Sequence, residues 1–182
     1  MKKSSNTAFI LRLSLTLLLI CAVVAAALAA VNSYTAPIIA KQKEEKTQLA
    51  VEAVLPGGGE EVEFTDETGM VTALYASDTG WAVQVTTNGF GGAVEMMVGI
   101  DKTGNVLGIS IIAHSETPSL GAVAADKGAA GTAFRSQFAG LSGTLAVSKD
   151  GGTVDAISGA TITSKAVTQG VNAALALVEN LG

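Results

Sequence analysis

The sequence predicts an α+β protein, in which an N-terminal transmembrane helix precedes an outer domain made of an antiparallel sheet and packed helices. Three observations support this fold class. An apolar run without charges covers Leu13–Val31, short β-prone segments alternate with turn sequences between residues 71 and 113, and an apolar stripe with helical spacing follows Lys165. The expected organisation is a cytoplasmic N-terminus at 1–12, a transmembrane helix at 13–31, a connector helix or stalk at 32–58 and an extracytoplasmic domain at 59–182.

The apolar run has the length of a membrane span, because as a helix it extends roughly 28 Å. Lys2, Lys3 and Arg12 precede it, and the next basic residue is Lys41. The positive-inside rule therefore predicts a single-pass protein of the cell membrane with a cytoplasmic N-terminus. The alternative is a signal peptide cleaved after Ala27-Leu28-Ala29, but the run is long for that role, which favours a permanent anchor.

The connector contains a second predicted helix. Ile38–Leu55 has charges clustered at Lys41–Lys46 and apolar residues towards its end, so we expect it to pack partly against the outer domain. A solvated stalk is the alternative for its charged half. Pro56-Gly57-Gly58-Gly59 ends this helix and marks the predicted domain boundary.

The outer domain begins with β-prone segments. The expected strands are Val71–Ala76, Trp81–Thr87, Ala93–Ile100 and Asn105–Ala113. Asp78-Thr79-Gly80 and Asp101-Lys102-Thr103-Gly104 suit tight turns between antiparallel neighbours. In the last strand Ile109, Ile111 and Ala113 share an apolar face, while the other face is mixed.

Two loops carry unusual sequences. Asn88-Gly89-Phe90-Gly91-Gly92 surrounds one aromatic ring with glycines, which suits either close approach to a flat ligand or a flexible hairpin loop. His114–Gly121 reads His-Ser-Glu-Thr-Pro-Ser-Leu-Gly and contains the single histidine of the chain. We expect His114 either to bond to local backbone at the strand end or to contact a ligand.

The C-terminal third is expected to be mainly helical. The predicted elements are a helix at Thr132–Phe138, a short strand at Leu145–Val147, a turn at Ser148–Thr153 and a last helix at roughly Lys165–Asn180. Phe134 and Phe138 share one helix face and are expected in the core.

Hydroxyl side chains surround Gly159 directly before the last helix: Ser158, Thr161, Thr163 and Ser164. A flexible turn that opens into a helix N-terminus suits a phosphate, because the first amide groups of a helix lack partners and its dipole favours negative charge. The alternative is an ordinary helix cap.

Composition excludes several classes of function. A net charge of −5 argues against a nucleic-acid partner. A lone cysteine, Cys21 inside the apolar run, excludes an intrachain disulfide and a cysteine-ligated metal cluster, and a single histidine argues against a histidine-based metal site. We find no Ser-His-Asp arrangement and no catalytic carboxylate pair, so the sequence predicts no complete active site.

Two motifs resemble those of the FMN-binding domain family, which includes the G subunit of the Rnf electron-transfer complex and the C subunit of the sodium-pumping NADH:quinone reductase. Asp155, Ser158-Gly159-Ala160-Thr161 and Thr163-Ser164 resemble its flavinylation motif. His114–Gly121 resembles its His-x-Glu-Thr-Pro-Gly-Leu-Gly loop, with Ser119 in place of glycine. If that position requires a positive φ, the serine either strains the loop or shifts it.

The resemblance implies FMN joined to Thr161 through a phosphoester bond, with Thr163 as the first alternative. Thr161 would be an attachment point and not a catalytic nucleophile. The other cofactor-binding residues implied by the two motifs are Ser158, Gly159, Ala160, Thr163, Glu116, Thr117, Leu120 and Gly121.

The resemblance also implies a function, that of an electron-carrier subunit in a membrane-bound, ion-translocating ferredoxin:NAD oxidoreductase. The implied partners are other Rnf membrane subunits, including a second one with covalent FMN, and a flavin transferase that installs FMN from FAD. Chain length favours the Rnf protein over the longer quinone-reductase protein. The alternatives are a stand-alone anchored FMN-binding electron-transfer protein and a cofactor-free anchored binding or structural module.

Overall fold

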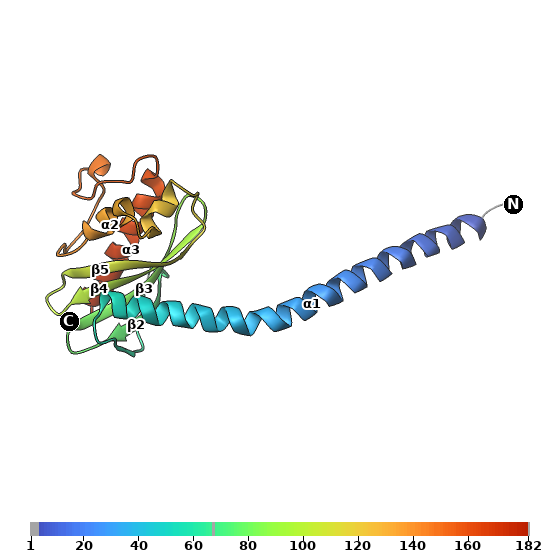
Figure 1. Cartoon of the computed structure of the whole chain (residues 1–182), viewed down its shortest axis with the longest axis horizontal. Coiled ribbons are helices and arrows are strands. Elements are labelled where there is room, and N and C mark those ends of the chain that lie inside the picture. The colour runs from blue at the N-terminus through green and yellow to red at the C-terminus, as the bar shows by residue number, and fades with distance from the viewer. Residues whose placement is uncertain (1–3, 67, 182) are drawn as a thin grey trace. The chain divides into compact units, whose positions relative to one another are not determined.

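The computed structural model describes residues 4–66 and 68–181, and the chain divides into two compact units between Glu45 and Lys46. The first unit is the larger part of helix α1, which runs without interruption through Ser4–Val54 (Figure 1). Within the described residues, α1 is the one helix long and apolar enough to cross a membrane. The side chains of 13–31 are exposed throughout, as expected for a segment that lipid surrounds.

The predicted connector helix is continuous with the predicted membrane span. Pro37 lies inside α1 and does not end it. Nearby hydroxyl groups bond to the helix backbone, since Ser33 donates to the carbonyl of Ala29 at 2.8 Å and Thr35 to that of Val31 at 3.0 Å. The two helices expected from the sequence are therefore a single element.

The second unit is built on a five-stranded antiparallel sheet with strand order β1-β2-β3-β4-β5. Its strands are β1 (Glu60–Glu61), β2 (Val71–Ala76), β3 (Gly80–Asn88), β4 (Ala93–Asp101) and β5 (Val106–His114). The predicted strands are confirmed, with ends that differ by a residue or so. Sequence reasoning missed β1, because its two exposed glutamates show no apolar alternation.

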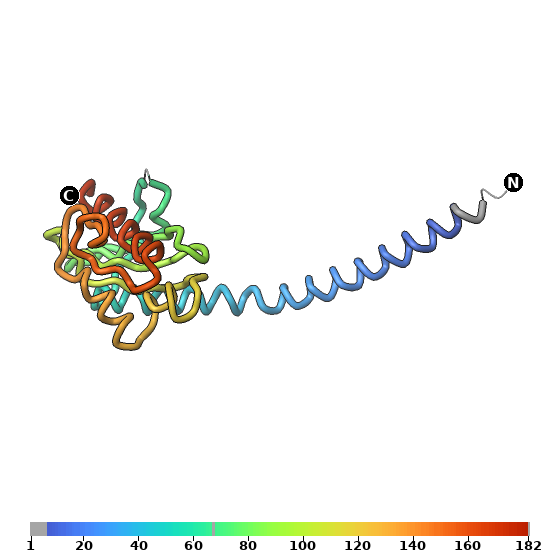
Figure 2. The backbone as a smooth tube through the Cα atoms, turned by 90° about the horizontal axis from the view of Figure 1, so that it is seen from above, coloured from blue at the N-terminus to red at the C-terminus, as the bar shows by residue number. Residues whose placement is uncertain are grey.

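Both faces of the sheet are covered. One face packs against α3 (Thr161–Glu179), which lies across the strands (Figure 2). Contact there is close, because a Cβ on Gly170 would collide with Met96. The other face packs against the end of α1, where Val54 and Leu55 lie beside Met97. The end of the connector is thus part of the outer domain, as the apolar residues after Lys46 suggested.

The remaining helices are short. They are η1 (Gly121–Ala125), α2 (Ala129–Ser136) and η2 (Ser148–Asp150). Phe134 and Phe138 are buried in the core with their rings edge to face at 5.5 Å, which confirms their predicted place. Phe138 lies just beyond the end of α2, so the predicted helix is shifted towards the N-terminus.

Two predictions about the C-terminal third were wrong. Leu145–Val147 forms no strand, since Val147 makes only an isolated parallel bridge to Val154. The last helix begins at Thr161 rather than at Lys165, and its N-cap is Ala160 rather than a serine or threonine. Thr161, Thr163 and Ser164 therefore lie inside the first turns of α3, although β-branched residues such as Thr161–Thr163 are poor helix formers.

Candidate functional site

A pocket of about 340 Å³ lies at the N-terminus of α3. The pocket is lined by the glycine-rich loop after β3, by the loop after β5 together with the start of η1, by η2, and by the turn and first residues of α3. Every cofactor-binding residue predicted from the sequence lines this pocket except Ser158. The fold therefore brings the two motifs together, although they are far apart in the sequence.

The two candidate threonines have different environments. Thr161 is the first residue of α3 and is half-buried, and its Oγ1 accepts a hydrogen bond from Nζ of Lys149 at 3.2 Å. Thr163 is only 1% exposed, and its Oγ1 donates to Oε2 of Glu116 at 2.7 Å. The Thr161 hydroxyl is thus accessible from the pocket, whereas the Thr163 hydroxyl is already used inside the protein.

Glu116 joins the segments of the site. Its side chain is 7% exposed, with Oε2 bonded to Thr163 and Oε1 accepting the N–H of Gly91 at 3.1 Å. Glycines surround the carboxylate closely, because a Cβ on Gly89 or Gly121 would collide with it. A buried carboxylate is stable only when it is hydrogen-bonded, so Glu116 fixes the glycine-rich loop against α3.

The side chain of His114 bonds to the loop backbone and does not line the pocket. Its Nδ1 accepts the backbone N–H of Glu116 at 3.2 Å, and its side chain is not among those that line the pocket. Of the two roles left open by the sequence, the structure shows the bond to local backbone. His114 therefore orients the residue that carries the buried carboxylate.

Apolar side chains form the rim of the pocket. Phe90 is 70% exposed at the tip of the glycine-rich loop, and Leu120 and Ile162 are also exposed. Exposed apolar side chains gathered around a concave site are suited to the face of a flat organic ligand. The glycine-rich loop thus presents an aromatic ring at the pocket that Thr161 also lines.

The N-terminus of α3 is suited to an anion. Its N-cap Ala160 has no side chain able to bond to the first amide groups, and the first turn contains no acidic residue. Gly159 has φ +74° in the turn before it. Ser164 holds that turn, since its Oγ accepts the N–H of Ile157 and donates to the carbonyl of Ala160, both at 3.0 Å.

Sequence reasoning missed Lys149. It lies in η2, and the contact with Thr161 depends on how η2 is held against α3. Asp150 and Lys165 form an ion pair at 2.7 Å between these two elements. The sequence around Lys149 does not predict its contact with Thr161, because lysines that contact only solvent are common in turns.

Ser119 has a strained backbone. Among residues 4–66 and 68–181 it is the only residue other than glycine with positive φ, at 63°. The condition stated for this position is therefore met, and the backbone of Ser119 is strained, since the left-handed region costs an L-residue roughly 1–2 kcal/mol.

We expect Ser119→Gly to raise the free energy of unfolding by about 0.5–1 kcal/mol, because relief of backbone strain outweighs the added flexibility of the unfolded chain. Urea unfolding of the detergent-solubilised protein, followed by the fluorescence of Trp81, measures the change. Ser136→Gly, at the end of α2, is the control and should lower stability instead. A stability loss in the Ser119 variant would contradict the assigned strain.

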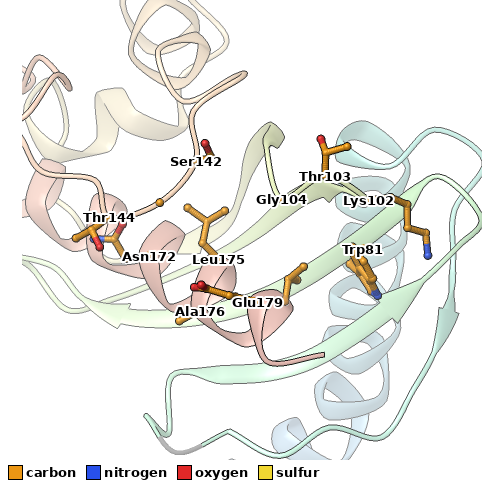
Figure 3. A pocket seen from close by; sticks show the side chains of 12 residues that line it. Trp81, Lys102, Thr103, Gly104, Ser142, Thr144, Asn172, Leu175, Ala176 and Glu179 are labelled. Carbon is orange, nitrogen blue, oxygen red and sulfur yellow. The ribbon is translucent and has the colours of Figure 1, made fainter. Parts of the chain in front are cut away.

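A second depression, of about 420 Å³, lies beside the C-terminal half of α3 (Figure 3). Its walls include Trp81, with Nζ of Lys102 at 4.3 Å from the ring centroid, and Leu175 and Glu179 of α3. None of the predicted site residues lies there. The pocket at Thr161 is therefore the better candidate for a functional site.

The residues of the pocket at Thr161 fit the parts of FMN. The open helix N-terminus and Lys149 suit its phosphate, and the rim of Phe90, Leu120 and Ile162 suits its isoalloxazine ring. Thr161, whose Oγ1 accepts the hydrogen bond from Lys149, lines the same pocket.

Comparisons with known proteins agree with this interpretation. The FMN-binding domain family matches residues 89–176, and the RnfG N-terminal region matches residues 1–54. The chain is 33% identical to the G subunit of the Na(+)-translocating ferredoxin:NAD(+) oxidoreductase complex of Acetobacterium woodii, over 94% of this chain and 93% of the relative. It is 35% identical to the G subunit of the proton-translocating ferredoxin:NAD(+) oxidoreductase complex of Clostridium ljungdahlii, over 95% and 92%. It is also 30% identical to the G subunit of the ion-translocating oxidoreductase complex of Methanosarcina acetivorans, over 94% and 95%.

Proposed function

The chain belongs to the FMN-binding domain family, among the G subunits of Rnf complexes, and we propose that it is the electron-carrier subunit of a membrane-bound, ion-translocating ferredoxin:NAD oxidoreductase. Bound FMN supplies the redox chemistry, because flavins exchange electrons singly or in pairs. The observation that carries the proposal is the pocket in which both family motifs meet at Thr161.

We further propose that the FMN is covalent and that Thr161 is its attachment point. The accessible hydroxyl at the start of α3 supports Thr161, and the buried bond to Glu116 argues against Thr163. A phosphoester bond prevents loss of the cofactor from a site that is open to solvent. Thr117 and Leu120 would line the flavin site from the loop after β5, and Gly121 from the start of η1.

The protein is anchored in the membrane by α1, and its orientation is part of the proposal. Lys2, Lys3 and Arg12 favour a cytoplasmic N-terminus, which leaves the FMN-binding domain on the extracytoplasmic side. Protease added to spheroplasts should then remove the outer domain. Cleavage that occurs only in inverted vesicles would reverse the assigned orientation.

The proposed partners are the other Rnf membrane subunits, including a second one with covalent FMN, and a flavin transferase that uses FAD. Affinity purification of the tagged full chain from solubilised native membranes tests the assembly. We expect co-purifying Rnf subunits together with ferredoxin-dependent NAD reduction. A yellow protein that purifies alone would favour the stand-alone carrier, and a colourless one would favour the cofactor-free module.

A further inference from the structure

We infer that Lys149 is the anion-binding residue of the attachment site: it orients the Thr161 hydroxyl for flavin transfer and then pairs with the phosphodiester that forms. The inference rests on the proposed covalent FMN and extends it to a residue outside both family motifs. Its starting observation is the hydrogen bond from Nζ of Lys149 to Oγ1 of Thr161 at 3.2 Å.

Two neighbouring contacts hold η2 against the first turns of α3. Lys149 and Asp150 are adjacent in η2, while Thr161 and Lys165 are one helical turn apart on α3 and share a face. Lys149 contacts Thr161, and Asp150 contacts Lys165 at 2.7 Å. The Asp150–Lys165 ion pair therefore leaves the Lys149 ammonium directed at the hydroxyl instead of at the neighbouring carboxylate.

The backbone on both sides of η2 is also fixed to the rest of the domain. Val147 bridges Val154, and Gly151 ends η2 with φ +83°. On the other side of this turn, Gln137 bonds to both backbone groups of Asp155, at 2.7 Å to its N–H and 3.2 Å to its carbonyl. The lysine thus extends from a backbone that is held at both ends, although its own side chain is exposed.

A cation at this place would favour the transfer step. Oγ of Thr161 attacks the phosphorus on the FMN side of the FAD pyrophosphate, the Oγ–P bond forms, and the bridging P–O bond to AMP breaks. AMP leaves with the electron pair of that bond, and the hydroxyl proton passes to solvent. Negative charge is spread over the phosphoryl oxygens and the departing oxygen in the transition state, and an ammonium group within hydrogen-bond reach stabilises it.

After transfer the same lysine has a permanent partner. Thr161 becomes a phosphodiester with one negative charge, located where Lys149 and the open N-terminus of α3 already favour an anion. The first turn of α3 contributes no acidic residue that would compete for the lysine.

The test is the rate of flavin incorporation into the detergent-solubilised full chain by a purified flavin transferase with FAD, read as in-gel fluorescence over time. Lys149→Gln should lower the initial rate roughly 10- to 100-fold, the range expected when a hydrogen bond to a charged group is lost. Lys149→Arg should restore most of the rate. Lys127→Gln, which removes an exposed lysine outside the pocket, controls for net charge and should leave the rate unchanged.

A second readout follows the product state. In fully flavinylated samples, the ³¹P resonance of the phosphodiester should shift in Lys149→Gln and return towards the wild-type position in Lys149→Arg. An unchanged rate together with an unchanged resonance in Lys149→Gln would overturn the inference. Equal slowing in Lys127→Gln would also overturn it, because the effect would then be general electrostatic attraction of FAD.

Failure of this inference is distinct from failure of the proposed function. If the wild-type chain takes no covalent flavin, or if Thr161→Ala takes it normally, the proposed attachment is wrong. If the wild-type chain is labelled at Thr161 and Lys149→Gln behaves identically, only the role of Lys149 is wrong.

Discussion

Thr161→Ala is expected to abolish covalent flavin while changing the free energy of unfolding by less than about 0.5 kcal/mol, as is usual for partly exposed positions. The variant removes the one candidate hydroxyl that is accessible from the pocket. After co-expression with a flavin transferase, denaturing electrophoresis under ultraviolet light should show a dark band for the variant and a fluorescent band for the wild type.

Two variants make the Thr161 experiment specific. Thr161→Ser keeps a hydroxyl at the same position and should retain covalent flavin. Thr163→Val keeps the shape of the side chain, removes the hydroxyl that donates to Glu116, and should also remain fluorescent. Fluorescence in Thr161→Ala together with its loss in Thr163→Val would move the attachment point to Thr163.

Among the pocket residues, Glu116→Ala should have the largest effect on stability. We expect it to lower the free energy of unfolding by about 3 kcal/mol. The variant leaves the Thr163 hydroxyl and the Gly91 N–H without their acceptor and creates a cavity beside Gly89 and Gly121. The glycine-rich loop is then no longer fixed to α3, so non-covalent FMN binding should weaken as well. Urea unfolding followed by Trp81 fluorescence and FMN titration of unflavinylated protein measure the two effects.

Glu116→Gln provides the matched comparison for the alanine variant. Its amide keeps one acceptor and fills the same space, so we expect a smaller loss of about 1 kcal/mol. Glu179→Ala, on the exposed end of α3, should change stability little. If the free energy of unfolding falls by less than about 0.5 kcal/mol in Glu116→Ala, the carboxylate does not fix the glycine-rich loop to α3.

Much of the sheet could be predicted from the sequence, because its signals are local. The segments that became β2 to β5 alternate with turns such as Asp101–Gly104, where Asp101 caps the turn by accepting the N–H groups of Thr103 and Asn105 at 2.8 and 2.9 Å. The pKa of Asp101 is lowered to about 2 by the Thr103 hydroxyl and by these backbone bonds. Such contacts join residues only a few positions apart, so they can be predicted from the local composition and spacing of the sequence.

The start of α3 could not be predicted in the same way. Thr161, Ile162 and Thr163 have low helical propensity, and the N-cap is an alanine, so local rules place the helix later. Tertiary contacts override them, because the Thr163 hydroxyl bonds to Glu116 from a distant loop. The same bond gives the two threonines, which the sequence left as alternatives, different environments.

The positions of Lys149 and Glu116 in the site also depend on the fold. The Glu116 carboxylate was predicted only as a residue of a loop that lines the flavin pocket, and its function as a bridge requires the approach of Gly91 and Thr163. The contact of Lys149 with Thr161 joins η2 to α3, as does the neighbouring ion pair between Asp150 and Lys165. Ser119 is the opposite case, since a single departure in a motif was enough to raise the question of strain there, and its φ is positive.

Covalent attachment of FMN to Thr161 is tested most directly by intact-mass spectrometry of the full chain co-expressed with a flavin transferase. We expect an increase in mass by one FMN less one water, and peptide mapping should assign the added group to Thr161. A chain of unmodified mass, obtained beside a transferase that flavinylates a known acceptor, would contradict the claim.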